Sequence, residues 1–210
     1  VLHTPEWYIK QGIELISGQV VVDVNRRQRE VLTDQGLSFT YDRLLFATGS
    51  VPFIIPIPNH NHSCVLSFRD IQDVEAMLSA TTNKKKVAVI GGGLLGLEAA
   101  KALRDLNLET HVVEFAPRLM AVQIDDLGGK VLRRKIENLG VKVHTQKATS
   151  SIEAGESATH VMKFADGSEL ETDIILFSAG IRPRDELART SGLALGERGG
   201  IKINDYCQTS

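Results

Sequence analysis

The chain has 210 residues, of which 42% are hydrophobic, and a formal net charge of −2, an ordinary composition for a folded globular protein. A charge this small gives no support for nucleic-acid binding, and no apolar run approaches the roughly 20 residues of a membrane-spanning helix. The two cysteines, Cys64 and Cys207, form no CxxC motif and are too few for a four-cysteine iron–sulfur cluster. No signal peptide is evident, so we expect a reducing, cytoplasmic setting without nucleic-acid or membrane partners.

Residues 1–50 read as a strand, a polar hairpin, an apolar strand and a glycine turn. The first strand is expected at Gln11–Leu15, and Gly36 lies in the hairpin turn. The segment YDRLLFATG at 41–49 then predicts the apolar strand and the turn that follows it.

Residues 51–58 are apolar but contain three prolines, which interrupt any regular element. His60, His62 and Cys64 follow, and their side chains are of metal-binding types, but no fourth ligand lies near them in the sequence. We therefore expect an ordinary solvated loop and no metal site. A helix is expected next, ending near residue 80, with one apolar stripe: Ile71, Val74, Met77 and Leu78.

The most informative run is VAVIGGGLLGLEAA at 87–100. A short apolar strand, Val87–Ile90, leads directly into Gly91, Gly93 and Gly96, and a helix pattern follows. In a dinucleotide-binding unit the first glycine allows a sharp turn, the second lets the backbone approach a pyrophosphate, and the third lets the helix pack against the strand. The pyrophosphate then sits on unpaired N–H groups at the positive end of the helix.

Two acids near this motif also have candidate roles. Glu114 ends the next apolar strand, 21 residues after Gly93, where an acid is expected to meet the ribose 2′-hydroxyl. Its charge would repel a 2′-phosphate and so favours NAD over NADP, although Arg118 could soften that preference; the alternative is a solvated carboxylate at a strand end. Glu98 either complements the dipole in the first helical turn or reaches toward the nicotinamide end. The helix is expected to bury a stripe of Leu95, Ala99, Ala102, Leu103 and Leu106.

The remaining segments complete the predicted sheet. A helix is expected at Lys130–Leu139 with Gly140 as its stop, a hairpin around Gly167, and a buried parallel strand at Asp173–Phe177. With the strand–helix–strand run before them, these elements predict an α/β fold, a doubly wound parallel sheet with an attached β-meander.

The chain also repeats itself at an offset of 131 residues. The segment 41–49 matches TDIILFSAG at 172–180, and Gly36 matches Gly167 at the same offset. A glycine fingerprint precedes the second copy, whereas none precedes the first copy. We infer two nucleotide-binding units in a parent protein, the first here lacking its opening strand, phosphate loop and helix. The alternative is that residues 1–50 form an unrelated β-rich segment.

Three motifs carry a resemblance to known proteins: YDRLLFATGS at 41–50, GGGLLGLE at 91–98 and SAGIRPRDEL at 178–187. They resemble the two-dinucleotide flavoprotein reductases, in which an NAD(P)H domain interrupts an FAD domain. More narrowly, the runs ETHVVEFAPRLM, GGKVLRRKIENLGVKVHT and FADGSELE are similar to the large subunit of the siroheme-dependent NAD(P)H nitrite reductases. Nearly the whole chain takes part in this likeness.

The resemblance implies roles for individual residues. For NAD it implies Gly91, Gly93, Leu95 and Gly96 at the pyrophosphate, Glu114 at the ribose and Gly180 near the nicotinamide. For FAD it implies Thr48 and Gly49 along the cofactor and Arg69 near the flavin, although Arg69 reads equally well as a surface arginine. The implied domains are 1–66, a partial FAD domain; 67–192, the NAD(P)H domain; and 193–210, a segment returning to the FAD domain.

We therefore expect an electron-input module that passes hydride from NADH to FAD, with no catalytic acid or base and no metal of its own. Its partners would be NADH, FAD and the remainder of the parent reductase. The FAD site is expected to be incomplete here, and siroheme and the iron–sulfur cluster to lie outside this chain. Two alternatives stay open: a rubredoxin or ferredoxin reductase or an NADH peroxidase of the same plan, and a non-catalytic NAD-binding module.

Overall fold

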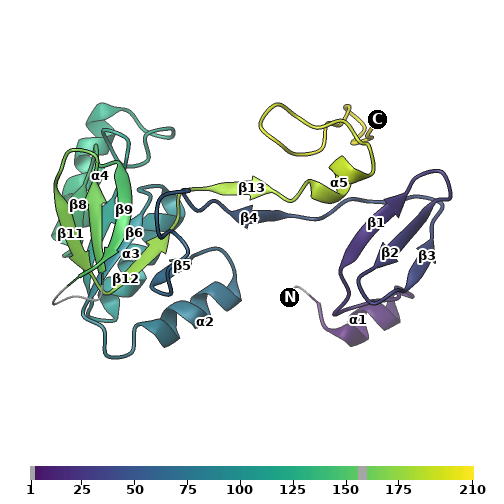
Figure 1. Cartoon of the computed structure of the whole chain (residues 1–210), viewed down its shortest axis with the longest axis horizontal. Helices are drawn as coiled ribbons and strands as arrows, with labels where there is room; N and C mark the ends of the chain where they lie inside the picture. Colours follow the sequence, from purple (N-terminus) through teal and green to yellow (C-terminus); the bar gives the residue numbers. More distant parts are fainter. Residues whose placement is uncertain (1–2, 156–159) are drawn as a thin grey trace. The chain divides into compact units, whose positions relative to one another are not determined.

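The computed structural model describes residues 3–155 and 160–210, and the chain divides into two compact units (Figure 1). The first unit comprises Val1–Ser50 and Pro183–Ser210, and the second comprises Val51–Arg182. In the part of the chain that is described, no helix is long and apolar enough to cross a membrane.

Both divisions fall earlier in the chain than the domain boundaries expected at 66/67 and 192/193. Residues just before 66 belong to the second unit because Ile54, Ile55 and Ile57 pack against its core. Helix α5 (Glu186–Thr190) belongs to the first unit because it packs against β1 (Val21–Asn25).

A five-stranded parallel sheet forms the centre of the second unit. Its strand order is β5-β12-β6-β7-β8. The strands are β5 (Val65–Ser67), β6 (Lys86–Ile90), β7 (Glu109–Val113), β8 (Lys142–His144) and β12 (Ile174–Phe177). Three helices connect them: α2 (Ile71–Ala80), α3 (Leu94–Asp105) and α4 (Asp126–Asn138). The antiparallel meander consists of β9 (Thr149–Ala154), β10 (His160–Phe164) and β11 (Glu169–Thr172).

Side chains alternate along the sheet and build one core on each face. Val87 and Val89 of β6 pack in a cluster with Leu103 of α3 and residues of the other helices. Ala88 and Ile90 face the other way and pack against the meander. The predicted α/β fold, a parallel sheet with an attached meander, is confirmed, with helices covering one face and the meander the other.

The predicted buried stripe of α3 is confirmed at Ala99 and Leu103 and wrong at its other three positions. Leu95, Ala102 and Leu106 are exposed, whereas the buried positions are Gly96, Leu97, Ala99, Ala100 and Leu103. The close approach of Gly96 to the end of β6 determines which face of α3 is turned toward the core. As a result, Leu95 is available to a ligand rather than to the core.

The first unit has short elements and few buried apolar side chains. Its helix α1 (Pro5–Lys10) and its strands β1, β2 (Glu30–Thr33) and β3 (Ser38–Thr40) are followed by α5 after the long excursion through the second unit. The hairpin predicted around Gly36 is present, and the glycine has φ +80°. The strand predicted at Gln11–Leu15 is absent, because that segment is an irregular connection with no ladder partner.

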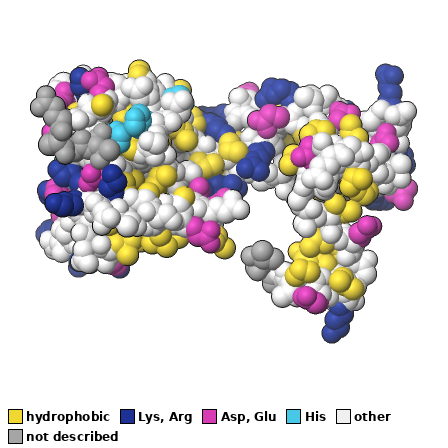
Figure 2. Space-filling view, turned by 60° about the horizontal axis from the view of Figure 1, so that its bottom comes forward, with side chains coloured by type: hydrophobic (Ala, Val, Ile, Leu, Met, Phe, Trp, Pro, Cys, Tyr) yellow, Lys and Arg dark blue, Asp and Glu magenta, His cyan; other side chains and the backbone are white. Residues whose placement is uncertain are grey.

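The apolar strand predicted at 41–46 is also absent. Its counterpart in the second unit, β12, lies between β5 and β6 and is fully buried, so that Leu176 has no exposed surface. Leu45, which matches Leu176 in the repeat, is 84% exposed, and no described strand pairs with its segment. A strand needs a hydrogen-bonded neighbour, and the first unit supplies none here. Figure 2 shows apolar side chains at the surface of the molecule in yellow.

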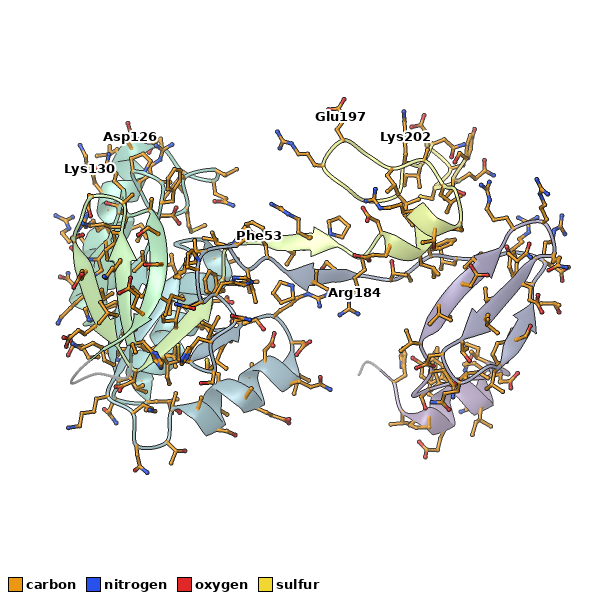
Figure 3. All side chains as sticks on the ribbon, in the orientation of Figure 1. Phe53, Asp126, Lys130, Arg184, Glu197 and Lys202 are labelled. Atoms are coloured by element: carbon orange, nitrogen blue, oxygen red, sulfur yellow. The ribbon has the colours of Figure 1, made fainter. Side chains whose placement is uncertain are left out.

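The chain passes between the units through two paired strands. These are β4 (Ser50–Pro52) and β13 (Ile181–Pro183), which form a two-stranded sheet. Phe53, labelled in Figure 3, follows β4, and its backbone N–H donates to the carbonyl of Gly180 at 2.9 Å. The guanidinium of Arg182 lies 4.1 Å from the centre of the Phe53 ring.

Two histidines on β7 and β8 predict a pH dependence of stability. His111 and His144 stack with their nitrogens 2.9 Å apart, and burial lowers the pKa of both. The pKa of each histidine is lower in the folded state than in the unfolded state, where it is about 6.5. Unfolding therefore takes up protons, and the protein loses stability as the pH falls below the unfolded-state pKa. The slope is at most about 1.4 kcal/mol per pH unit for each proton.

Urea unfolding at pH 7 and pH 5 measures this effect. We expect a lower free energy of unfolding at pH 5, and a smaller difference in His144→Gln than in the unmodified chain. Replacing the exposed His3 by glutamine is the matched control and should leave the difference unchanged. Equal pH dependence in the His144→Gln variant and the unmodified chain would contradict the assignment.

Candidate functional site

A cavity of about 810 Å³ lies in the second unit at the carboxyl ends of its parallel strands. Ile90, Val113 and Phe177, the last residues of β6, β7 and β12, all line it. The glycine loop after β6, the start of α3 and the segment after β7 also line the cavity. Ligands of open parallel sheets bind at this edge, beyond the carboxyl ends of the strands.

Gly91 and Gly96 are required by close backbone contacts. Gly91 has φ +117°, and a Cβ built there would lie 2.3 Å from the carbonyl oxygen of Ser178. A Cβ on Gly96 would lie 2.0 Å from the carbonyl oxygen of Gly91. The sharp turn and the close helix packing predicted for these two glycines are therefore present.

Gly93 differs because its surroundings are open. It is the N-cap of α3 in an extended conformation, and a Cβ built on it would meet nothing within 4 Å. No side chain caps α3, whereas Asp70 caps α2 and Asp125 caps α4 with carboxylate oxygens. The first N–H groups of a 12-residue helix and its positive end thus face the cavity, which suits a phosphate group.

Glu114 is held at the edge of this loop by two backbone donors. The N–H of Gly92 donates to its Oε2 at 2.6 Å, and the N–H of Ala116 donates to its Oε1 at 2.7 Å. The side chain is half-buried and lines the cavity. A carboxylate has about four acceptor positions, so two remain for hydroxyl donors of a ligand.

Sequence reasoning missed Gly92, which it treated as the variable position of the motif. Gly92 is buried, and a Cβ there would lie 2.6 Å from Cδ2 of Leu119 and 3.0 Å from Oε2 of Glu114. Its carbonyl also accepts the N–H of Met120 at 2.9 Å. Only a residue without a side chain lets the loop close onto Glu114, and no general motif at this position signals that contact.

The other expected site residues fall into two groups. Leu95, Arg69 and Gly180 line the same cavity, and Gly180 has φ +107°. Thr48 and Gly49 lie in the first unit, where Thr48 Oγ1 donates to the carbonyl of Arg184 at 2.7 Å. Gly49 has φ +68°, and its carbonyl accepts the N–H of Arg184 at 3.0 Å.

The position of Glu98 supports neither of the two roles expected for it. Since α3 begins at Leu94, Glu98 is the fifth residue of the helix and belongs to its second turn, so the expected place in the first turn was wrong. It is exposed and does not line the cavity, which gives no support to the second interpretation either.

Arg118 is occupied inside the protein. Its guanidinium donates to the carbonyls of Ile124 and Ala121 and forms an ion pair with Asp126 at 2.7 Å. Asp126, labelled in Figure 3, is the first residue of α4. Arg118 does not line the cavity and is therefore not placed to receive a 2′-phosphate there.

A parallel sheet whose uncapped crossover helix begins at the strand ends is the arrangement of dinucleotide-binding proteins. The comparison with protein families agrees: residues 7–210 match the model described as pyridine nucleotide-disulphide oxidoreductase, and the chain belongs to this family.

Curated relatives share most of this chain. It is 51% identical over 205 residues to the nitrite reductase (NADH) large subunit of Escherichia coli (strain K12), which covers 97% of this chain and 24% of the relative. It is 38% identical to the assimilatory nitrate reductase electron transfer subunit of Bacillus subtilis (strain 168), of which it covers 27%. The chain thus spans about a quarter of the length of these relatives.

Solved structures show the same fold. The ferredoxin reductase for the CYP199A2 system from Rhodopseudomonas palustris has a TM-score of 0.88 and 30% identity, with 93% of this chain and 48% of that chain covered. An NAD-dependent persulfide reductase from A. fulgidus has a TM-score of 0.92 and 27% identity, with 100% of this chain and 39% of that chain covered.

Proposed function

We propose that this chain is the electron-input part of a longer reductase, in which NADH binds in the cavity of the second unit and delivers hydride to FAD. The observation that carries the proposal is the start of α3 at Gly93. No side chain caps the helix there, and a Cβ built on Gly93 would meet nothing within 4 Å. Family membership and the relatives that are named as NADH enzymes support it.

Residues of the chain position NADH in this scheme. Gly91, Gly93 and Leu95, which line the cavity, receive the pyrophosphate, and Gly96 behind them lets α3 begin close to it. Glu114 receives the adenosine ribose, and Gly180 lies at the nicotinamide end. When bound, FAD supplies the two-electron acceptor, and Thr48, Gly49 and Arg69 would contact it. Hydride transfer between two such cofactors needs no side-chain acid or base, so the chain contributes orientation and electrostatics. The free state of both cysteines favours a cytoplasmic location.

The identity of the ribose partner predicts a cofactor preference. Glu114 places a negative charge at the cavity edge, and Arg118 is engaged elsewhere, so a 2′-phosphate meets repulsion without compensation. We expect NADH to bind at least tenfold more tightly than NADPH, a difference of about 1.4 kcal/mol. In Glu114→Ala the two affinities should approach each other, as measured by calorimetric titration.

The exposed Glu98 is the matched control for that experiment, since it is an acid near the loop but outside the cavity. Glu98→Ala should keep the preference for NADH. A wild-type chain that binds both nucleotides equally would remove the assigned role of Glu114.

The terminal acceptor is the finer part of the proposal. Relatives named nitrite reductases reach 51% identity, and we propose nitrite as the acceptor, reduced at siroheme and iron–sulfur centres outside this chain. A second candidate, transfer to a ferredoxin, is favoured by the 30% identical ferredoxin reductase structure. NADH oxidation by the FAD-loaded reductase, measured with nitrite or with ferredoxin as acceptor, separates the two.

A further inference from the structure

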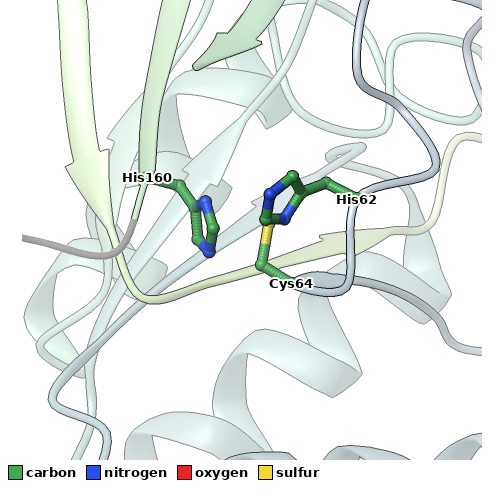
Figure 4. Close-up of side chains that lie close together, drawn as sticks. All are labelled: His62, Cys64 and His160. Carbon is green, nitrogen blue, oxygen red and sulfur yellow. The ribbon is translucent and has the colours of Figure 1, made fainter. Parts of the chain in front are cut away.

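Three metal-binding side chains meet in the second unit although they are far apart in the sequence (Figure 4). His62 and Cys64 lie in the segment that enters β5, and His160 is the first residue of β10. Their potential ligand atoms all lie within 4.8 Å of one another. The expectation of an ordinary loop rested on the lack of a further ligand nearby in sequence, and the fold brings one from the meander.

The cluster contains a buried polar atom that lacks a partner. His160 is 4% exposed, and its Nδ1 has no hydrogen-bond partner in the described part of the chain. Its ring meets the ring of His62 edge to face, with 4.5 Å between centroids. Buried polar atoms in folded proteins are nearly always paired, so an unpaired nitrogen beside a thiol and a second imidazole calls for a ligand.

The burial of Cys64 argues against a role as a freely reactive thiol. Its side chain is 8% exposed, so reagents in solution have little access to the sulfur. The other cysteine, Cys207, belongs to the first unit, and neither forms a disulfide. The surroundings of the cluster include one cationic side chain, Lys84, and one anionic side chain, Asp173.

We propose that His62, Cys64 and His160 form a zinc site with three protein ligands and an open fourth position. Zinc takes thiolate sulfur at about 2.3 Å and imidazole nitrogen at about 2.0 Å in tetrahedral geometry, which places ligand atoms roughly 3.3–3.6 Å apart. The ligand atoms already lie within 4.8 Å of one another, so metal binding would have to draw them together by at most about 1.5 Å. A soft sulfur with two imidazoles suits zinc and disfavours magnesium or calcium.

A metal bound at this site would link the loop before β5, through His62 and Cys64, to the meander, through His160. The same loop already contacts β9, where Asn59 Nδ2 donates to the carbonyl of Ile152 at 2.6 Å and the N–H of Ile152 donates to the carbonyl of Pro58 at 3.2 Å. Because this contact positions the loop, the three ligands are held near one another before a metal binds. Binding to the folded state alone then stabilises the second unit.

Cobalt titration of the full 210-residue chain tests the proposal, because Co²⁺ replaces Zn²⁺ and its thiolate complexes absorb strongly. We expect a one-to-one thiolate-to-cobalt absorption band that added Zn²⁺ abolishes. Cys64→Ser and His160→Gln should each weaken the apparent affinity at least 100-fold. The matched controls are Cys207→Ser, at the exposed cysteine, and His60→Gln, at a histidine whose Nδ1 contacts the carbonyl of Ile57.

A second measurement guards against variants that fold poorly. His62 is exposed, so His62→Gln should keep the native circular dichroism while losing the cobalt band. Zn²⁺ should also raise the melting temperature of the unmodified chain and leave that of His62→Gln unchanged. The proposal is overturned if no cobalt band appears, if the band depends on Cys207, or if it survives in a folded His62→Gln variant.

Discussion

Replacing Gly93 by valine is expected to weaken NADH binding at least 100-fold, about 2.7 kcal/mol, while the protein stays folded. Gly93 has φ −81° and ψ −178°, an extended conformation that valine adopts readily, and a Cβ there meets no protein atom within 4 Å. The added methyl groups instead occupy the open space in front of the first N–H groups of α3, where the pyrophosphate is expected to bind. Calorimetric titration with NADH measures the loss, and thermal unfolding checks the fold.

Ala102→Val is the matched control for Gly93→Val. Ala102 is exposed on the same helix, outside the cavity, so the substitution enlarges a side chain without approaching the ligand. It should bind NADH like the unmodified chain. If Gly93→Val kept full affinity for NADH, the pyrophosphate would not lie at the start of α3, and the proposed binding mode would be wrong.

Replacing Gly96 by alanine should cause a large loss of stability. The new Cβ would lie 2.0 Å from the carbonyl oxygen of Gly91, and this neighbour is backbone, so α3 and the end of β6 must move apart. Overpacking of this kind costs about 1–3 kcal/mol, and we expect a value near the upper end. Urea unfolding measures it as a lower midpoint with an unchanged slope.

Gly93→Ala is the control for that experiment, since it adds the same methyl group three residues earlier, where the surrounding space is open. The two alanine variants should differ in stability: Gly96→Ala loses stability, and Gly93→Ala keeps it. Equal stability of the two variants would show that the close contact between α3 and β6 is not required.

Local patterns predicted the second unit well because its signals are short-range. The strand, the glycine turn and the helix after it are adjacent in sequence, and Gly91 and Gly96 meet the steric demands that the motif predicts. The hairpin at Gly167 and the buried strand before Gly180 also follow from local residue types.

Predictions failed where the outcome depended on residues distant in the chain. The apolar segment around Leu45 forms no strand because strand formation depends on a neighbour, which the pattern of its own residues cannot specify. Gly92 acquires its role from Glu114, which lies 22 residues further on, and the loop at His62 meets His160 only through the meander. The stripe of α3 shifted because a backbone contact, rather than the most apolar face, sets the helix orientation.

Titration of NADH into the unmodified 210-residue chain tests the central claim most directly. The claim is that the glycine loop between β6 and α3 binds NADH as the entry point for electrons. It predicts one NADH bound per chain, displaced by ADP-ribose, which carries the same pyrophosphate and adenosine ribose. No binding of NADH, or binding that ADP-ribose leaves unaffected, would contradict it.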